Sequence, residues 1–315
     1  MRTGFTYKGI HSSAYGITVK TQDRPIIPAA KTKTYSALYM DGTYDFSEAN
    51  PYERRFYEER VFTEVLQITA ENLSELQKSI GKIAVWLLGG GDLIFDDTPN
   101  VRWTARCDGS ISFAPERRGK SAVVTVQFKV SAFAYSRIST LDGALIGDPL
   151  PLESNIPLDM PSFYTHTFAA APGVTSNDVT ITVPNFGDRP FRPVITITAA
   201  DEDLVVPDMY FSTGGSSVVF DCGSRELSVK ARDSSGAHPS IAVDFDLQKV
   251  TVDGGEGTVM DISGEFFEMS GENPCLTVTA RIVNNTEDDI DCTVTVDFTP
   301  QAVWDLDFDS VEWED

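Results

Sequence analysis

Histidine, serine and lysine motifs give little support for catalysis in this sequence. The three histidines, His11, His166 and His238, lie far apart along the chain. No Cys or His residues have the spacing of a zinc site, and no glycine-x-serine-x-glycine elbow is present. Arg118-Gly119-Lys120-Ser121 ends like a phosphate-binding loop, but that loop needs glycine where Ala114 stands. We therefore predict no catalytic residues, no cofactor and no enzymatic activity.

Carboxylates are the most abundant reactive groups, and one cluster of them has the composition of a calcium site. The chain has 47 Asp and Glu against 25 Lys and Arg, which gives a net charge of -22. Calcium prefers hard oxygen ligands, so the candidate ligands are Glu287, Asp288, Asp289 and Asp291. The EF-hand spacing is absent, and a solvated turn is the alternative. No glycosidase-like pair can be singled out among so many acids.

Charge divides the chain into two halves near residue 140. Residues 1–140 carry 18 Lys and Arg and 15 Asp and Glu, whereas residues 141–315 carry 7 and 32. This step predicts two domains, and the acidity of the second argues against binding to a phosphate backbone. No apolar run approaches the roughly 18 residues of a transmembrane helix. We predict neither sequence-specific nucleic-acid binding nor membrane insertion.

Hydrophobic periodicity predicts a mainly β protein with one helix. A helix is expected over residues 72–88, capped by Asn72 and ended by Gly89-Gly90-Gly91. Its apolar stripe would comprise Leu73, Leu76, Ile80, Ile83 and Leu87. Residues 124–130 alternate between apolar and polar side chains, which is typical of a half-buried strand. The short, evenly spaced apolar runs of residues 166–304 predict an antiparallel β-sandwich.

Three further segments have a distinct composition. Residues 21–60 read as an extended arm or hairpin within the first domain, 1–140, and residues 141–165 as a proline-rich linker. Residues 305–315 form an acidic tail. Tyrosine is favoured at protein interfaces, and the candidate interface residues of the arm are Tyr35, Tyr39, Tyr44, Tyr52, Arg54 and Arg55.

The order of several short motifs in residues 1–140 resembles the N-terminal domain of the distal tail proteins of long-tailed, non-contractile bacteriophages. The motifs are Trp86-Leu87-Leu88, Leu93-Ile94-Phe95-Asp96-Asp97, Trp103 to Gly109, Val126-Gln127-Phe128-Lys129 and Phe133-Ala134-Tyr135. The second half is similar to the galectin-like sandwich that often follows in this family, through Asn185-Phe186-Gly187-Asp188, residues 193–198 and residues 264–268. The resemblance implies an N-terminal β-sandwich with one helix, followed by a galectin-like antiparallel β-sandwich.

The same resemblance implies a structural role at the tip of a phage tail. The family would form a ring, expected to be hexameric, that joins the tail tube to the tail-associated lysin or hub protein and contacts other baseplate or receptor-binding proteins. DNA would only pass through its central opening. Such a protein would be made and assembled in the cytoplasm of the bacterial host.

A carbohydrate-binding role for the second domain is the alternative function. Exposed aromatic side chains on a β-sandwich can stack on sugar rings, which would aid adsorption to the host surface. The candidates for such stacking are Trp304, Trp313, Tyr210 and Phe211.

Overall fold

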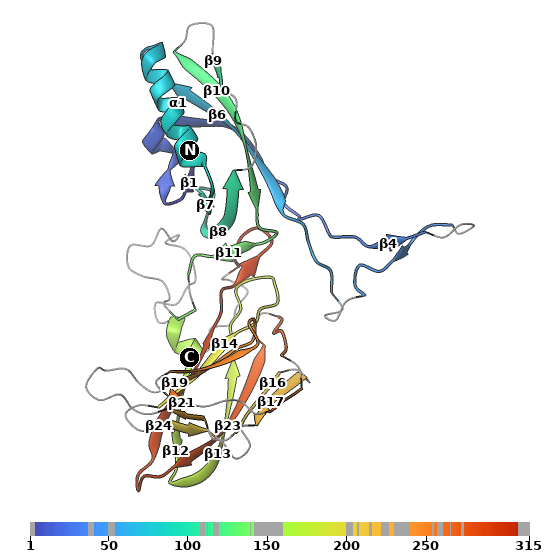
Figure 1. Cartoon of the computed structure of the whole chain (residues 1–315), viewed down its shortest axis with the longest axis vertical. Helices are drawn as coiled ribbons and strands as arrows, with labels where there is room; N and C mark the ends of the chain where they lie inside the picture. The colour runs from blue at the N-terminus through green and yellow to red at the C-terminus, as the bar shows by residue number, and fades with distance from the viewer. Residues whose placement is uncertain are drawn as a thin grey trace. The chain divides into compact units, whose positions relative to one another are not determined.

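The computed structural model describes most of the chain as two compact units. The described residues are 4–36, 41–49, 54–107, 111, 113–115, 120–138, 140–141, 160–199, 204–206, 208–213, 216–221, 227–229, 240–253, 255–256, 261–264, 266–271 and 274–307. The first unit comprises Met1–Arg137 and Ala302–Asp305, and the second comprises Ile138–Gln301 and Leu306–Asp315 (Figure 1). No helix in these described ranges is long and apolar enough to cross a membrane.

The first unit is built on an antiparallel sheet with the order β2-β1-β7-β8-β10-β6-β3. These strands are β1 (Phe5–Tyr7), β2 (Ile10–His11), β3 (Ile17–Asp23), β6 (Arg60–Thr69), β7 (Gly90–Phe95), β8 (Thr98–Cys107) and β10 (Ser121–Val130). The short strands β9 (Phe113–Pro115) and β11 (Ala134–Ser136) pair with β10 and β8, and η1 (Ser12–Tyr15) is a single 3-10 turn. The alternation predicted for residues 124–130 is confirmed, because Val124, Val126, Phe128 and Val130 are buried.

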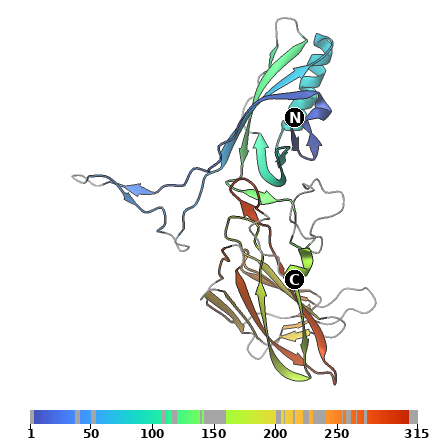
Figure 2. The same ribbon diagram turned by 180° about the vertical axis from the view of Figure 1, so that it is seen from behind.

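The one α-helix in the described part of the chain, α1 (Leu73–Leu87), packs on this sheet (Figure 2). It begins as predicted, because the Asn72 side chain accepts a 3.0 Å hydrogen bond from the Glu75 amide. It ends before Gly89, whose φ of 81° is the left-handed conformation that favours glycine. The predicted stripe needs correction at Leu73, which is 53% exposed. Trp86 is buried instead, because the last turn of the helix, and not the first, lies over the aromatic core around Phe5.

The second unit contains two five-stranded antiparallel sheets, as the predicted sandwich requires. One sheet has the order β12-β24-β14-β19-β20 and the other β13-β23-β16-β17-β22. The strands of the first are β12 (Thr165–Ala170), β14 (Val194–Ala199), β19 (Ser240–Asp244), β20 (Lys249–Asp253) and β24 (Ile290–Asp297). Those of the second are β13 (Gly173–Thr182), β16 (Asp208–Thr213), β17 (Ser216–Asp221), β22 (Asp261–Gly264) and β23 (Cys275–Asn284). A smaller sheet holds β15 (Leu204–Val206), β18 (Leu227–Val229) and β21 (Gly255–Glu256).

Two segments connect the units in sequence. Residues 142–159 of the predicted linker lie outside the described residues. Its last part forms the 3-10 helix η2 (Met160–Tyr164), and the buried Tyr164 hydroxyl donates a 2.6 Å hydrogen bond to the Pro184 carbonyl. The chain returns to the first unit at residues 302–305, which begin with the last residue of β25 (Gln301–Ala302). There Trp304 packs near Phe62 and Trp103.

Candidate interaction surface

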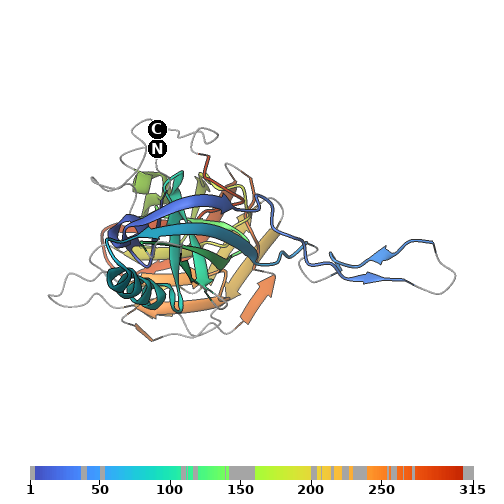
Figure 3. The same ribbon diagram turned by 90° about the horizontal axis from the view of Figure 1, so that it is seen from above.

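A two-stranded arm leaves the sheet of the first unit between β3 and β6 (Figure 1, Figure 3). At its base the Lys31 amide donates to the Phe56 carbonyl and the Glu58 amide donates to the Ala29 carbonyl, both at 2.8 Å. Further out, β4 (Thr34–Tyr35) pairs with β5 (Tyr44–Asp45) as a separate antiparallel ribbon. The extended arm or hairpin expected over residues 21–60 thus takes the form of a narrow hairpin.

Polar contacts within the arm hold its shape. The Arg55 guanidinium forms ion pairs with Asp45 at 2.8 Å and with Glu48 at 3.0 Å. The Lys33 amide donates a 2.9 Å hydrogen bond to the Ser47 hydroxyl. The carboxylate of Asp45 also accepts from Ser47, and the hydrogen bonds from Ser47 hold the pKa of Asp45 below its ordinary value. The hydrogen bond between Lys33 and Ser47 joins the two strands of the arm, whereas the contacts of Arg55 and Asp45 stiffen its returning segment.

The arm exposes large apolar side chains. Tyr35 and Tyr44 are cross-strand partners that are 61% and 60% exposed, and Ile27 is 75% exposed. The other large apolar side chains exposed on the arm are Ile26, Phe46 and Phe56. An isolated two-stranded hairpin is at best marginally stable in water, because it has no core of its own. Apolar side chains gathered on such a ribbon are typical of a surface that another protein covers.

The predicted interface residues have different roles in this arrangement. Tyr35 and Tyr44 lie exposed on the ribbon, whereas Tyr39 and Tyr52 fall outside the described residues. The Arg54 guanidinium lies over the Phe56 ring, 5.1 Å from its centre. Arg55 forms its ion pairs inside the arm, so we assign it to the rigidity of the arm.

Arg60 anchors the arm to the sheet, a role that the sequence did not reveal. Its buried guanidinium donates hydrogen bonds to the carbonyls of Pro25 and Ile26 at the base of the arm, at 3.2 and 2.6 Å. It also donates to the carbonyls of Ala132, at 2.8 Å, and Val303, at 2.5 Å. One side chain therefore joins the arm, the end of β10 and the segment 302–305.

Glu64, which also lies on β6, is a second buried ionisable residue. Its side chain is fully buried, and neither carboxylate oxygen has a hydrogen-bond partner among the described residues. Its cross-strand partner is Gln22 on β3. Burial raises the pKa of Glu64 to about 8, although the Arg24 guanidinium and the nearby Gln22 amide, which lies outside good hydrogen-bond geometry, act in the opposite direction. The carboxyl group is therefore held mostly as the neutral acid at neutral pH.

The sequence of the domain that carries the arm matches the model of a known protein family. Residues 10–130, which include the arm and most of its sheet, match the family described as the phage tail protein RIFT-related domain. The match spans residues 10–130 of the 315 residues of the chain and lies within the first unit. The resemblance to phage tail proteins that the sequence motifs suggested is thereby confirmed for this domain, and the chain is mainly β.

One solved structure of a phage protein shares the fold of this chain at a level that supports comparison. The crystal structure of the Dit protein of phage SPP1, described as a paradigm of the hub adsorption apparatus in phages that infect Gram-positive bacteria, matches with a TM-score of 0.55. The two chains are 11% identical, and the match covers 93% of this chain and 98% of the SPP1 chain. A chain of the activated phage P2 baseplate with calcium is 9% identical, with 91% and 100% covered, but its TM-score of 0.35 is too low to support an argument. No curated protein sequence matches significantly.

Three of the candidate calcium ligands, Glu287, Asp288 and Asp289, lie exposed on the turn between β23 and β24. The fourth, Asp291, is exposed on β24 itself. The turn is closed by Asn284, whose amide donates to the Asp288 carbonyl at 2.8 Å. Within the described ranges, no group of three or more His, Cys, Asp or Glu side chains converges to hold a metal ion. The calcium site and its alternative, a solvated turn, both stay predictions.

The aromatic residues considered for sugar stacking are mostly used in packing. Phe211 is buried against Phe245, and Trp304 packs in the first unit near Trp103. Tyr210 is partly exposed on β16, and Trp313 lies outside the described residues. The described aromatic side chains thus give no continuous stacking platform, and the arm is the stronger interaction surface.

Proposed function

We propose that the protein is the distal tail protein of a long-tailed, non-contractile phage. In this proposal six copies form a ring at the tail tip, which joins the tail tube to the tail-associated lysin or hub protein. Other baseplate proteins attach to the ring, and DNA passes through its central opening. The protein acts as an assembly platform without enzymatic activity, and it is made in the cytoplasm of the bacterial host and incorporated into the virion.

The observation that carries this proposal is an arm with exposed apolar side chains on a phage tail domain. A contact between the arm of one copy and a different surface of the next is head-to-tail, and such contacts build closed rings when the rotation between copies closes. The near-neutral charge of residues 1–140 favours close packing of copies in the ring. The strongly acidic second half favours a position that faces water.

Removing the outer part of the arm tests this proposal. Residues 32–55 would be replaced by a short glycine-serine linker, which keeps the backbone contact between Lys31 and Phe56 at the base. We expect this variant to fold, because the deleted ribbon contributes no buried core residue among those described. It should remain a monomer under conditions in which the intact protein forms rings, as measured by light scattering and electron microscopy.

A matched pair of substitutions separates the arm from general surface effects. Tyr35→Ser together with Tyr44→Ser removes the two exposed aromatic partners of the ribbon. We expect the concentration needed for ring formation to rise at least about tenfold, because tyrosine is enriched among the interface residues whose loss costs more than about 1 kcal/mol. Tyr210→Ser in the second unit is the control and should assemble normally. Rings that persist unchanged in both arm variants would show that the arm is not the contact.

A further inference from the structure

The second unit has a long strand with an open edge. β13 (Gly173–Thr182) is the outermost strand of its sheet and pairs only with β23 among the described strands (Figure 1). All ten of its residues keep one unbroken register with β23. In an antiparallel pair, alternate residues direct both main-chain groups away from the partner, so about five residues of β13 present N–H and C=O groups along the outer edge. Such a row of groups is a template for another strand.

β13 lacks the features that usually protect a free edge. Edge strands in most proteins are short, carry a bulge, or contain lysine or proline. β13 contains neither lysine nor proline, and Asp178 is its only charged residue. The end strand β3 of the first unit, in contrast, has a shift of register at Lys20. The end strands β2, β12, β20 and β22 have between two and six residues.

The core-facing side chains of β13 are incompletely covered. Asn177 and Val179 lie opposite Ala280 and Val278 of β23. Cross-strand partners point to the same face of a sheet. Ala280 and Val278 are buried there, whereas Asn177 and Val179 are only partly buried. A strand added beside β13 would cover this border of the core.

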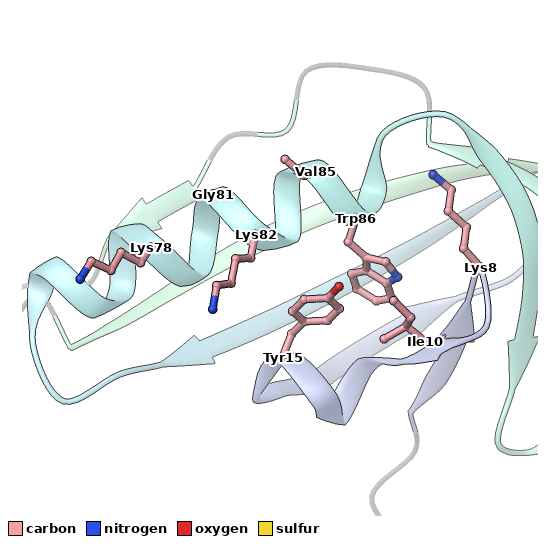
Figure 4. A pocket seen from close by; sticks show the side chains of 8 residues that line it. All are labelled: Lys8, Ile10, Tyr15, Lys78, Gly81, Lys82, Val85 and Trp86. Atoms are coloured by element: carbon pink, nitrogen blue, oxygen red, sulfur yellow. The ribbon is translucent and has the colours of Figure 1, made fainter.

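The hollow beside α1 in the first unit is, by contrast, already filled by the chain itself (Figure 4). Lys78 and Lys82 border it, but the Trp86 side chain within it is only 5% exposed. The Trp86 ring stacks on Phe5 and contacts Tyr15, with 5.7 and 4.8 Å between the ring centres. Its aromatic surface is therefore used in packing, whereas the outer edge of β13 has no partner among the described residues.

Charge defines the kind of strand that fits this edge. Residues 141–315 carry 7 Lys and Arg against 32 Asp and Glu, and Asp178 lies near the middle of β13. This half of the chain repels an acidic segment, including the β13 strand of a second copy, and attracts a basic one. A basic side chain opposite Asp178 would form a favourable cross-strand pair. We propose that β13 accepts an extended basic segment of another protein as an added strand.

The side chains of β13 also restrict the sequence of such a segment. Main-chain hydrogen bonds supply the affinity of an added strand, and alternate side chains supply its specificity. The exposed side chains Val174, Ser176 and Thr180 are small or β-branched and uncharged. They fit a segment in which β-branched residues alternate with basic ones. The contact lies on the second unit and involves neither the arm nor the proposed ring.

Hydrogen exchange in the full-length protein tests this proposal. The probe is the synthetic peptide Lys-Thr-Val-Thr-Lys-Val-Thr-Val, and exchange is followed by mass spectrometry with and without it. We expect the peptide to slow exchange of the β13 amides at least about tenfold, because an added strand gives the outward N–H groups acceptors. The interior strand β16 should exchange as before. Two control peptides should give no protection: one N-methylated at alternate residues, with the same charge, and one with glutamate in place of lysine.

A matched pair of substitutions locates the contact. Thr180→Lys and Tyr210→Lys each add one positive charge to the same face of the sheet, the first on the edge strand β13 and the second on the interior strand β16. Thr180→Lys should weaken binding of the basic peptide at least about fivefold, whereas Tyr210→Lys should change it less than about twofold, because only the first charge lies beside the added strand. Fluorescence anisotropy of the labelled peptide measures both effects.

Four results would each overturn the proposal. They are unprotected β13 amides in the presence of the basic peptide, equal protection by its N-methylated form, equal effects of the two substitutions, and protection of β13 that grows with protein concentration without any peptide. The last result would assign the edge to a second copy of this chain. Ring formation is measured separately, so none of these results bears on the proposed function.

Discussion

Replacing Arg60 with methionine is expected to lower the free energy of unfolding of the first unit by about 3–5 kcal/mol. Arg60 donates hydrogen bonds to four main-chain carbonyls and lies 4.8 Å from the centre of the Trp103 ring. Methionine fills similar space but leaves these carbonyls without their donor, and hydrogen bonds from charged groups contribute roughly 1.5–3 kcal/mol each. Losses at shared sites are not additive, which keeps the expected total below the sum.

Chemical denaturation followed by tryptophan fluorescence measures this effect. Trp86, Trp103 and Trp304 all lie in the first unit, so their signal reports on its unfolding. Arg106→Met is the matched control, because the Arg106 guanidinium is about half exposed and pairs with Glu59 at the surface. Its loss should stay within about 1 kcal/mol. Equal losses in the two variants would contradict the anchoring role of Arg60.

The first unit is also expected to lose stability as the pH rises from about 5 to 9, because of Glu64. Its pKa is about 8 in the folded state and 4.5 as the ordinary value. Between these values the folded state holds a proton that the unfolded state releases, so the free energy of unfolding falls with increasing pH. The stabilising contribution of Glu64 is fully present below its ordinary pKa of 4.5, and it is lost as the pH rises through its folded-state pKa of about 8. The full effect is on the order of 5 kcal/mol, at about 1.4 kcal/mol per pH unit.

Glu64→Gln isolates this contribution. The variant has no ionisable group at the position, so its unfolding free energy should change much less between pH 5 and pH 9. Glu71→Gln, at an exposed site before α1, is the control and should keep the pH dependence of the parent protein. If the pH dependence of Glu64→Gln equals that of the parent, Glu64 is not the titrating group.

Local sequence patterns predicted those elements whose side chains obey a simple period. In β10 and in the regular strands of the second unit, apolar and polar residues alternate, which places the apolar residues on one face. Their burial therefore follows from the local order of residues alone. The start of α1 was equally predictable, because the Asn72 cap depends on residues three positions apart.

The features that position the candidate interaction surface depend on contacts distant in sequence. The inward positions of β6 include Arg60 and Glu64, which interrupt the apolar alternation, and the carbonyl partners of Arg60 reach as far as Val303. Trp304 packs against Phe62, a contact for which local sequence carries no signal. The tyrosines of the arm were noted from composition, but their exposure depends on the separation of β4 and β5 from the main sheet.

The central claim, that this phage tail protein assembles into a closed ring, is tested most directly by the mass of the purified full-length protein in solution. Light scattering over a range of concentrations, with electron microscopy of the same samples, would give the mass and the shape of the particles. The account predicts particles of six times the chain mass of 34.5 kDa, seen as rings with a central opening. A mass equal to that of one chain at every concentration, with no ring-shaped particles, would contradict it.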